Sequence, residues 1–192
     1  MPSDLTIRLA TEDDLEAIGT IFNHYIETST CTFNLKPQTN EEYKTWFRSR
    51  TEKLPIIVGE IAGTVVGYAA LSQWRRVGTA YSRSVEGSVY VEKTHLRQGI
   101  GKALAVDLIE RAKAHGHRTL IGGACTEQEA SLALQRSLGF ESVGVFKNVA
   151  INSTVGYTSS THNSCCQTRK GPPTPSVILS PKTKNPFGPW TI

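Results

Sequence analysis

The sequence lacks the features that mark membrane-spanning and nucleic-acid-binding proteins. No apolar run in its 192 residues approaches the roughly 20 residues that cross a bilayer. The net charge of +4 is mild, and lysines and arginines form no block. The first residues, Met1 to Asp4, lack the charged and apolar regions of a signal peptide. We therefore expect a cytoplasmic protein that binds neither a membrane nor a nucleic acid.

Cysteine is scarce, and its positions indicate neither a disulfide framework nor a zinc site. Cys31 and Cys125 stand alone, and the adjacent Cys165 and Cys166 could bridge each other only under strain. We therefore expect no bound metal. Hydrophobic residues make up 39% of the chain and charged residues 20%, a balance typical of a globular enzyme with a sizeable core.

The hydrophobic periodicity predicts an alternating series of strands and helices over residues 6–146. Thr11 and Asp14 form a capping box that predicts a helix start, and Ala62-Gly63 predicts a hairpin. The predicted strands are 6–9, 56–61, 64–71, 84–91, 119–124 and 140–146, and the predicted helices follow Thr11 and span 41–52, 101–114 and 128–138. This order indicates an α/β fold with a mixed sheet between helices.

The segment from Val89 to Leu104 is the most informative part of the chain. An apolar strand passes through a short turn into Gly99-Ile100-Gly101 and then an amphipathic helix. Unpaired N–H groups at such a helix start bind anions such as a diphosphate. The exposed edge of the strand can pair with an extended ligand that carries amides. Coenzyme A has both groups; the alternative is that the two glycines only make a tight turn.

Residues 5–150 resemble the GNAT superfamily of acetyl-CoA-dependent N-acetyltransferases, and within it the phosphinothricin and methionine sulfoximine acetyltransferase branch. The motifs that carry the resemblance stand in order: Ile7-Arg8, Thr11–Leu15, Phe22-Asn23-His24-Tyr25, Thr32-Phe33, Gly67-Tyr68-Ala69, Ser84–Val91, Gly99-Ile100-Gly101, Leu108–Ala112, Ala130-Ser131 and Leu138-Gly139-Phe140. The resemblance implies a mixed, mostly antiparallel central sheet flanked by helices on both faces. It also implies acetyl-CoA as co-substrate and direct transfer to the amine of a small amino-acid-like acceptor.

The resemblance further implies roles for single residues. Glu86 is the expected general base, taking a proton from the incoming ammonium through water, and a main-chain N–H near Val89 is expected to stabilise the oxyanion. Acetyl-CoA is expected to bind Val89, Tyr90, Val91, Arg97, Gln98, Gly99, Ile100, Gly101, Lys102 and Gln128. The acceptor is expected to meet Phe33, Arg76 and Tyr81, with Arg75 and Arg83 as alternatives to Arg76 for its carboxylate. Phe33 and Tyr81 could equally be core residues.

Three residues depart from the family pattern in ways that bear on activity. Leu96 stands where the diphosphate motif usually has Gln or Arg, and Gln128 stands where an Asn usually meets the pantetheine. Gln135 stands where the branch has a His, and other members a Tyr that protonates the leaving thiolate. An amide cannot act as that acid, so the substitution lowers the expected rate without excluding the reaction.

The largest departure is the C-terminal segment. We expect residues 1–150 to form an incomplete acetyltransferase domain and residues 151–192, rich in Ser, Thr and Pro, to form a disordered tail. The last strand of the sheet is then missing or altered. Read from the third base of the Ile151 codon, degenerate codons permit Lys-Phe-Asp-Arg-Trp-Leu, which resembles the family's continuation. Out-of-frame translation is therefore one interpretation of the tail.

Three functions stay open at this point. The first is acetylation of a phosphinothricin-like or methionine sulfoximine-like acceptor. The second is a GNAT enzyme that acts on another amine, such as a protein N-terminus, a polyamine or an aminoglycoside. The third is a degenerate coenzyme A-binding protein without activity, which Leu96, Gln135 and the tail favour. The family branch also makes a homodimer an expected assembly.

Overall fold

The computed structural model describes residues 2, 4–75, 78–146 and 176–181. In this part of the chain, seven strands form one sheet in the order β1-β2-β3-β4-β5-β7-β6. The strands are β1 (Thr6–Leu9), β2 (Ile56–Ile61), β3 (Thr64–Gln73), β4 (Ser84–Val91), β5 (Thr119–Cys125), β6 (Phe140–Phe146) and β7 (Ser176–Pro181). The helices are α1 (Leu15–Thr28), α2 (Asn40–Arg48), α3 (Ile100–Ala114) and α4 (Glu129–Ser137), with short 3-10 turns at Glu12–Asp14 and Lys93–His95.

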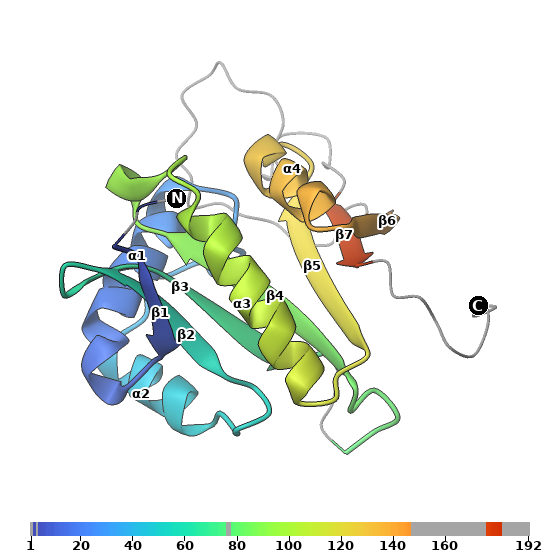
Figure 1. Cartoon of the computed structure of the whole chain (residues 1–192), viewed down its shortest axis with the longest axis horizontal. Helices are drawn as coiled ribbons and strands as arrows, with labels where there is room; N and C mark the ends of the chain where they lie inside the picture. The colour runs from blue at the N-terminus through green and yellow to red at the C-terminus, as the bar shows by residue number, and fades with distance from the viewer. Residues whose placement is uncertain (1, 3, 76–77, 147–175, 182–192) are drawn as a thin grey trace.

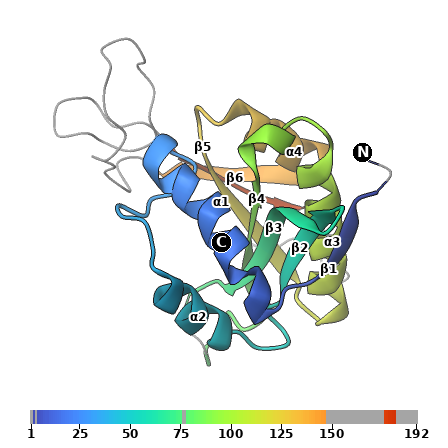
Figure 2. The same ribbon diagram turned by 90° about the vertical axis from the view of Figure 1, so that its left-hand side faces the viewer.

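The sheet is mostly antiparallel, and helices cover both of its faces. Every neighbouring pair of strands runs antiparallel except β4 and β5. Helices α1 and α2 lie on one face, and α3 and α4 lie on the other (Figures 1 and 2). The predicted fold class, a mixed and mostly antiparallel sheet between two helical layers, is confirmed.

Each face of the sheet packs its own hydrophobic core. Between the sheet and α3, the core contains Ile57, Val66, Leu71, Val85, Leu104 and Leu108. Between the sheet and α1 and α2, it contains Ile18, Ile21, Tyr43, Val58, Tyr68 and Ala70. Because side chains alternate along a strand, the even-numbered residues of β4 face α1 and α2, and the odd-numbered ones face α3.

The predicted helix start at Thr11 is confirmed. The Asp14 carboxylate accepts a hydrogen bond of 2.8 Å from the Thr11 N–H. Arg8 donates to both oxygens of the same carboxylate, at 2.7 and 2.8 Å, and also reaches Glu60 on β2 at 2.8 Å. One arginine therefore ties β1, β2 and the entry to α1 together.

Helix α2 is shorter than its periodicity predicts. It ends at Arg48 rather than near residue 52, and the Arg50 N–H turns back to the Phe47 carbonyl at 3.0 Å. A second turn follows, in which the Leu54 N–H donates to the Thr51 carbonyl at 2.9 Å. The early end frees Arg50 from the helix surface and lets its side chain reach the sheet.

The expected loss of the last strand is corrected for six residues of the tail. Strand β7, Ser176–Pro181, lies between β5 and β6 and pairs antiparallel with both, for example Gly122 with Leu179 and Val145 with Val177. Three consecutive apolar residues, Val177-Ile178-Leu179, suit a strand enclosed by two others. The other residues of the predicted tail lie outside the described residues.

Candidate active site

The parallel strands β4 and β5 separate midway along the sheet. They pair only from Ser84 with Thr119 to Glu86 with Ile121, and the rest of β5 pairs with β7 instead. Figure 1 shows the two strands diverging from this point. Among the described residues, no strand pairs with Gly87–Val91 on the side away from β3. We call this separation of β4 from β5 after Glu86 and Ile121 the fork. It exposes the edge of β4 at Gly87–Val91, which can bind an extended chain with amide groups.

The residues that offer main-chain groups to the fork follow from the hydrogen bonds on either side of β4. The Ser84 carbonyl accepts from the Trp74 N–H at 3.1 Å, and the Glu92 N–H donates to the Val66 carbonyl at 2.8 Å. Both bonds point toward β3. The main-chain N–H and C=O groups of the even-numbered residues of β4 therefore face β3, and those of the odd-numbered residues face the fork. Tyr25 donates its hydroxyl to the Val91 carbonyl at 2.6 Å, which leaves the main chain of Val89 open.

Tyr90, which the sequence analysis places on the cofactor, lies differently from Val89. Its main chain faces β3 because it is even-numbered, and it pairs with Tyr68. Its ring lies on the α1 face of the sheet, stacked on Tyr68 with 5.3 Å between ring centroids and edge-on to Phe22 at 4.9 Å. Tyr90 therefore offers its ring to the α1 face and not its main chain to the fork.

The start of α3 is an open cradle of N–H groups. Gly99 caps the helix with a φ of 84°, a conformation that favours glycine, and the first helical hydrogen bond runs from the Ala103 N–H to the Gly99 carbonyl at 3.0 Å. Among the described residues, no acceptor meets the N–H groups of Gly99, Ile100, Gly101 or Lys102. The first turn contains no acidic residue. These donors and the helix dipole favour a bound anion.

Gly101 is not required by packing within the protein. A Cβ atom at this position would lie 3.4 Å from Val91 Cγ2 and 3.8 Å from Leu134 Cδ2, which are ordinary contacts. The protein's own packing would therefore tolerate a methyl group at this position. The turn before it is fixed by Glu92, whose carboxylate accepts from the Thr94 N–H at 2.8 Å and contacts His95 Nδ1 at 2.9 Å. Burial alone would raise the pKa of Glu92, but these hydrogen bonds lower it to about 2.

The remaining predicted cofactor residues lie around this cradle. Arg97, Gln98 and Lys102 are exposed at its rim, and Arg97 has a φ of 61°. Leu96 is 49% exposed and contributes no charge. Gln128 lies at the start of α4, and its Nε2 donates to Thr30 Oγ1 at 3.1 Å. In this structure the Gln128 amide thus ties α4 to the loop after α1.

Glu86 lies at the point where β4 and β5 separate. Its side chain is on the α1 face, with Oε1 3.8 Å from the position that a Cβ atom on Gly123 would take. No described residue donates a hydrogen bond to the carboxylate or pairs with it. Burial raises the pKa of Glu86 above its ordinary value. An unpaired carboxylate with a raised pKa at a strand fork suits a general base.

Gln135 flanks the same fork from the opposite face. Gly122 is the first residue of β5 beyond the pairing with β4, and a Cβ atom there would lie 3.1 Å from Gln135 Cδ. The Gln135 Oε1 atom is buried and has no hydrogen-bond partner among the described residues. The fork therefore lies between a carboxylate on the α1 side and an unpaired amide oxygen on the α4 side.

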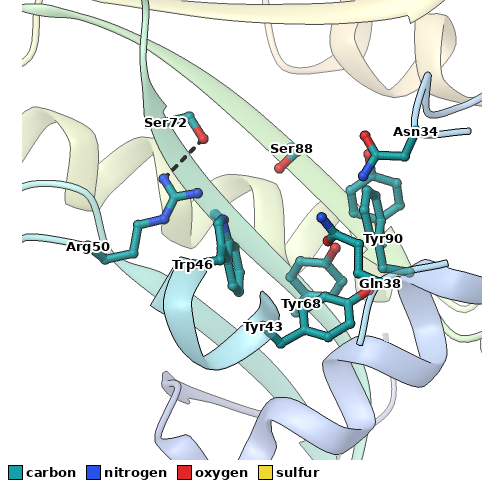
Figure 3. Close-up of a pocket in the computed structure, with 11 residues that line it drawn as sticks. Asn34, Gln38, Tyr43, Trp46, Arg50, Tyr68, Ser72, Ser88 and Tyr90 are labelled. Atoms are coloured by element: carbon teal, nitrogen blue, oxygen red, sulfur yellow. Dashed lines mark hydrogen bonds between the residues drawn. The ribbon is translucent and has the colours of Figure 1, made fainter. Parts of the chain in front are cut away.

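A cavity of about 200 Å³ opens on the α1 face beside Glu86. Ser72 and Ser88 line it, and both are neighbours of Glu86 on this face, one across the β3–β4 pair and one along β4. The other lining residues are Phe22, Asn34, Gln38, Tyr43, Trp46, Arg50, Tyr68, Ala70 and Tyr90 (Figure 3). An apolar, aromatic cavity with a few polar groups is typical of a small-molecule site.

The predicted acceptor residues do not line this cavity. Phe33 is 43% exposed and Tyr81 is 52% exposed. Arg75 lies over the ring of Trp74, with its Cζ 5.3 Å from the centroid, and Arg83 is exposed. Arg76 lies outside the described residues. The acceptor roles of these five residues stay predictions.

Arg50, the only arginine among the residues that line the cavity, is not among the site residues predicted from the sequence. The sequence carries one weak signal for it, a cation that follows Trp46 and Phe47 at the end of a predicted helix. Such a position is usually a solvated charge, so only the packing of α2 against the sheet identifies it.

Comparison with known proteins decides the family. A model of the acetyltransferase (GNAT) domain matches residues 7–154, well over half of the chain. The chain belongs to the GNAT acetyltransferases. A phosphinothricin N-acetyltransferase of Streptomyces viridochromogenes is 34% identical over 141 residues, which cover 73% of this chain and 76% of that protein. An L-methionine sulfoximine/L-methionine sulfone acetyltransferase of Salmonella typhimurium is 33% identical over 137 residues, covering 71% and 80%.

A solved structure gives the same family. The GNAT superfamily phosphinothricin acetyltransferase of Sinorhizobium meliloti, crystallised in complex with acetyl-CoA, superposes with a TM-score of 0.80 at 28% identity. The match covers 98% of this chain and 94% of that one. The predicted family, the N-acetyltransferase class and acetyl-CoA as co-substrate are confirmed.

The residues of this GNAT acetyltransferase fit acetyl-CoA. The N–H cradle at Gly99–Lys102 suits its diphosphate, and the open main chain of Val89 suits the amides of its pantetheine arm. In the described residues, no three His, Cys, Asp or Glu side chains gather at a position that could hold a metal ion. No described helix is both long and apolar enough to span a membrane.

Proposed function

We propose that this GNAT enzyme acetylates the amine of a small amino-acid-like acceptor of the phosphinothricin or methionine sulfoximine type. The observation that carries the proposal is the Glu86 carboxylate, which no described residue pairs with, and whose neighbours across the β3–β4 pair and along β4, Ser72 and Ser88, line the cavity. A cavity of about 200 Å³ suits a small acceptor. The names of the two relatives support the acceptor class.

The chain's residues divide the chemistry among them. Glu86 accepts the proton that the acceptor's ammonium must lose before it attacks, directly or through water. Acetyl-CoA supplies the thioester carbonyl that the amine attacks. The open N–H of Val89 is the donor that we assign to the developing oxyanion. Gln135 cannot protonate the leaving thiolate, so that group departs as the anion.

A second candidate is a coenzyme A-binding protein that has lost its activity. Gln135 favours it, because its amide oxygen is buried without a partner at a position where an acid would assist departure of the thiol. Leu96 also favours it, since an exposed apolar side chain stands at the rim of the diphosphate cradle. Gln135 would affect the rate at which the thiolate leaves, and Leu96 would affect the affinity for acetyl-CoA. Neither residue alters Glu86 or the cavity.

One experiment separates the candidates. Isothermal calorimetry measures acetyl-CoA binding, and a free-thiol assay then follows turnover with phosphinothricin, L-methionine sulfoximine, spermidine, kanamycin and an alanine-initiated peptide. We expect thiol release with the first two acceptors. Binding of acetyl-CoA without thiol release on any amine would instead establish the inactive candidate. Release on the polyamine, aminoglycoside or peptide alone would contradict the proposed acceptor class.

Three further assignments stay proposals. We keep Phe33, Arg76 and Tyr81 as predicted acceptor contacts, to be tested by alanine substitution and the KM for the acceptor. We keep residues 1–150 as the main part of the acetyltransferase domain, which the GNAT domain match to residues 7–154 supports, and Ser176–Pro181 adds strand β7 to its sheet. A cytoplasmic homodimer stays the predicted state, which sedimentation velocity and cell fractionation would test.

A further inference from the structure

The guanidinium of Arg50 is held rigidly at one end of the cavity. Its Nη1 donates to the Leu71 carbonyl at 2.8 Å and to Ser72 Oγ at 3.1 Å (Figure 3). Its Cζ lies 4.8 Å from the centroid of the Trp46 ring. Two hydrogen bonds and one stacking contact together fix the plane of the guanidinium. Arg50 is therefore oriented before any ligand arrives.

The other edge of this guanidinium meets no hydrogen-bond acceptor in the part of the chain that the structure describes. Nε is buried and makes no hydrogen bond, and none joins Nη2 to a described residue. No described carboxylate lies within ion-pair distance of Arg50, whereas Arg48 and Arg111 each have one and Arg8 has two. A buried donor of a charged group that lacks an acceptor is costly. Nη2 lies on the same edge but is not enclosed by protein, so it is the donor that a carboxylate in the cavity can reach.

Ser72 connects Arg50 to Glu86, the proposed general base. Arg50 binds Ser72, and Ser72 lies directly across the β3–β4 pair from Glu86 on the same face. Side chains in such cross-strand pairs have Cβ atoms about 4.5–5.5 Å apart. The cavity thus offers a cation at one end and an unpaired carboxylate beside it, without an ion pair between the two.

We propose that Arg50 binds the α-carboxylate of the acceptor and so selects α-amino acids that have a free carboxylate next to the amine. This inference rests on the proposed function. An α-amino acid carries its ammonium and carboxylate on one carbon, so a carboxylate on Arg50 directs the amine toward Glu86. The aromatic rings of Trp46, Tyr68 and Tyr90 enclose the rest of the molecule. Polyamines and aminoglycosides have no carboxylate to place on Arg50.

The test compares Arg50→Gln with Arg48→Gln, which removes the same charge two residues earlier. Arg48 is 64% exposed and pairs with Glu12 away from the cavity. Each protein is assayed with L-methionine sulfoximine and with its carboxamide, which retains the amine but lacks the charge. We expect Arg50→Gln to raise the KM for the acid about tenfold to a hundredfold, from the loss of a charge-assisted hydrogen-bonded pair. The KM for the carboxamide and the acetyl-CoA affinity should stay unchanged, and Arg50→Lys should recover part of the loss.

A binding measurement keeps this inference separate from the proposed function. Trp46 fluorescence reports on the cavity because its ring contacts Arg50. Quenching by the acid but not by the carboxamide, abolished in Arg50→Gln and retained in Arg48→Gln, supports the inference even if no acceptor is turned over. A wild-type enzyme that acetylates acid and carboxamide with equal KM overturns the inference while leaving the proposed function intact. An equal loss with both acceptors in Arg50→Gln would make Arg50 structural and also overturn it.

Discussion

The hydroxyl of Tyr25 on α1 donates a hydrogen bond of 2.6 Å to the carbonyl oxygen of Val91, the last residue of β4. Val91 borders both the open strand edge and the turn that leads to α3. Tyr25 thereby joins the helix beside the acceptor cavity to the strand beside the cofactor. It also satisfies a carbonyl that the fork would otherwise leave without a strand partner.

Replacing Tyr25 with Phe should weaken acetyl-CoA binding more than it slows the chemical step. The substitution leaves the Val91 carbonyl without its donor, and the net cost of one such hydrogen bond is about 0.5–1.5 kcal/mol. We expect a severalfold rise in the acetyl-CoA dissociation constant by calorimetry, with kcat near the wild-type value. A protein that loses stability in urea but binds acetyl-CoA normally would show that the bond serves only the fold.

Replacing Glu86 with Gln should nearly abolish turnover while leaving acetyl-CoA binding intact. The amide is close in size but cannot accept the ammonium proton, and a positioned base typically contributes about 10²–10⁴ in rate. Steady-state kinetics at neutral pH would measure the loss in kcat. Glu110→Gln, which alters an exposed carboxylate paired with Lys113, is the matched control. A fall in kcat below twofold would exclude Glu86 as the base.

The raised pKa of Glu86 also predicts two pH dependences. The base must be ionised, so kcat/KM should rise with pH and level off above a pKa that is higher than an ordinary glutamate's. Because the folded pKa is raised, the stability that Glu86 contributes is present at low pH and is lost as pH rises through that pKa. Glu86→Gln should therefore become more stable than wild type as pH rises through the same range. Thermal unfolding from pH 4 to 8 would measure this difference, and a constant difference would contradict it.

Replacing Gly101 with Ala should distinguish an anion cradle from a simple tight turn. The added methyl would make only ordinary contacts with Val91 and Leu134, and alanine favours the helix by about 1 kcal/mol. We expect an unfolding midpoint at or above the wild-type value. If a bound diphosphate approaches the main chain closely at Gly101, the methyl should hold it away from the free N–H groups and lower acetyl-CoA affinity about tenfold or more. Unchanged affinity in calorimetry would assign Gly101 to the turn alone.

Replacing Asp14 with Asn should destabilise the protein and change its response to acid. The Arg8 guanidinium, hydrogen-bonded to the carboxylate, lowers the pKa of Asp14 despite its burial. The stability that the Asp14 carboxylate contributes is therefore present above its pKa in the unfolded state. It is lost as the pH falls through its pKa in the folded state. Urea unfolding at neutral pH should show a loss of about 1.5–3 kcal/mol that shrinks on acidification. Glu12→Gln, which breaks an exposed pair with Arg48, should change little.

Replacing Gln135 with Leu should stabilise the protein without lowering kcat. The Oε1 atom of Gln135 is buried and unpaired, and an unsatisfied polar atom costs about 1–3 kcal/mol that an apolar side chain of similar size avoids. Thermal unfolding would measure the gain. Because an amide supplies no proton, turnover should stay at the wild-type level. A marked fall in kcat would instead indicate that the amide contacts the reacting groups.

The amino-acid pattern was enough to predict the family, the order of the elements from 6 to 146 and the cofactor half of the proposed site. Those signals are local: periodicity, one capping box, and a strand, turn and helix that follow one another between Val89 and Leu104. When the donors of a site are consecutive in the chain, the main-chain geometry of a single turn brings them together. Glu86, five residues earlier than Val91 on the same strand, could be placed through the family resemblance.

The acceptor half of the proposed site could be recognised only in the folded chain. Arg50, Ser72 and Glu86 come from three separate segments, and nothing local indicates that α2 ends early enough for Arg50 to reach β3. How much of the β4 edge is open depends on where β5 separates from β4. That point depends in turn on the pairing of β5 with β7. Strand β7 shows the same limit, since Val177-Ile178-Leu179 becomes a strand only through pairing with β5 and β6. Long-range pairing and packing, which the sequence pattern does not encode locally, fixed these features.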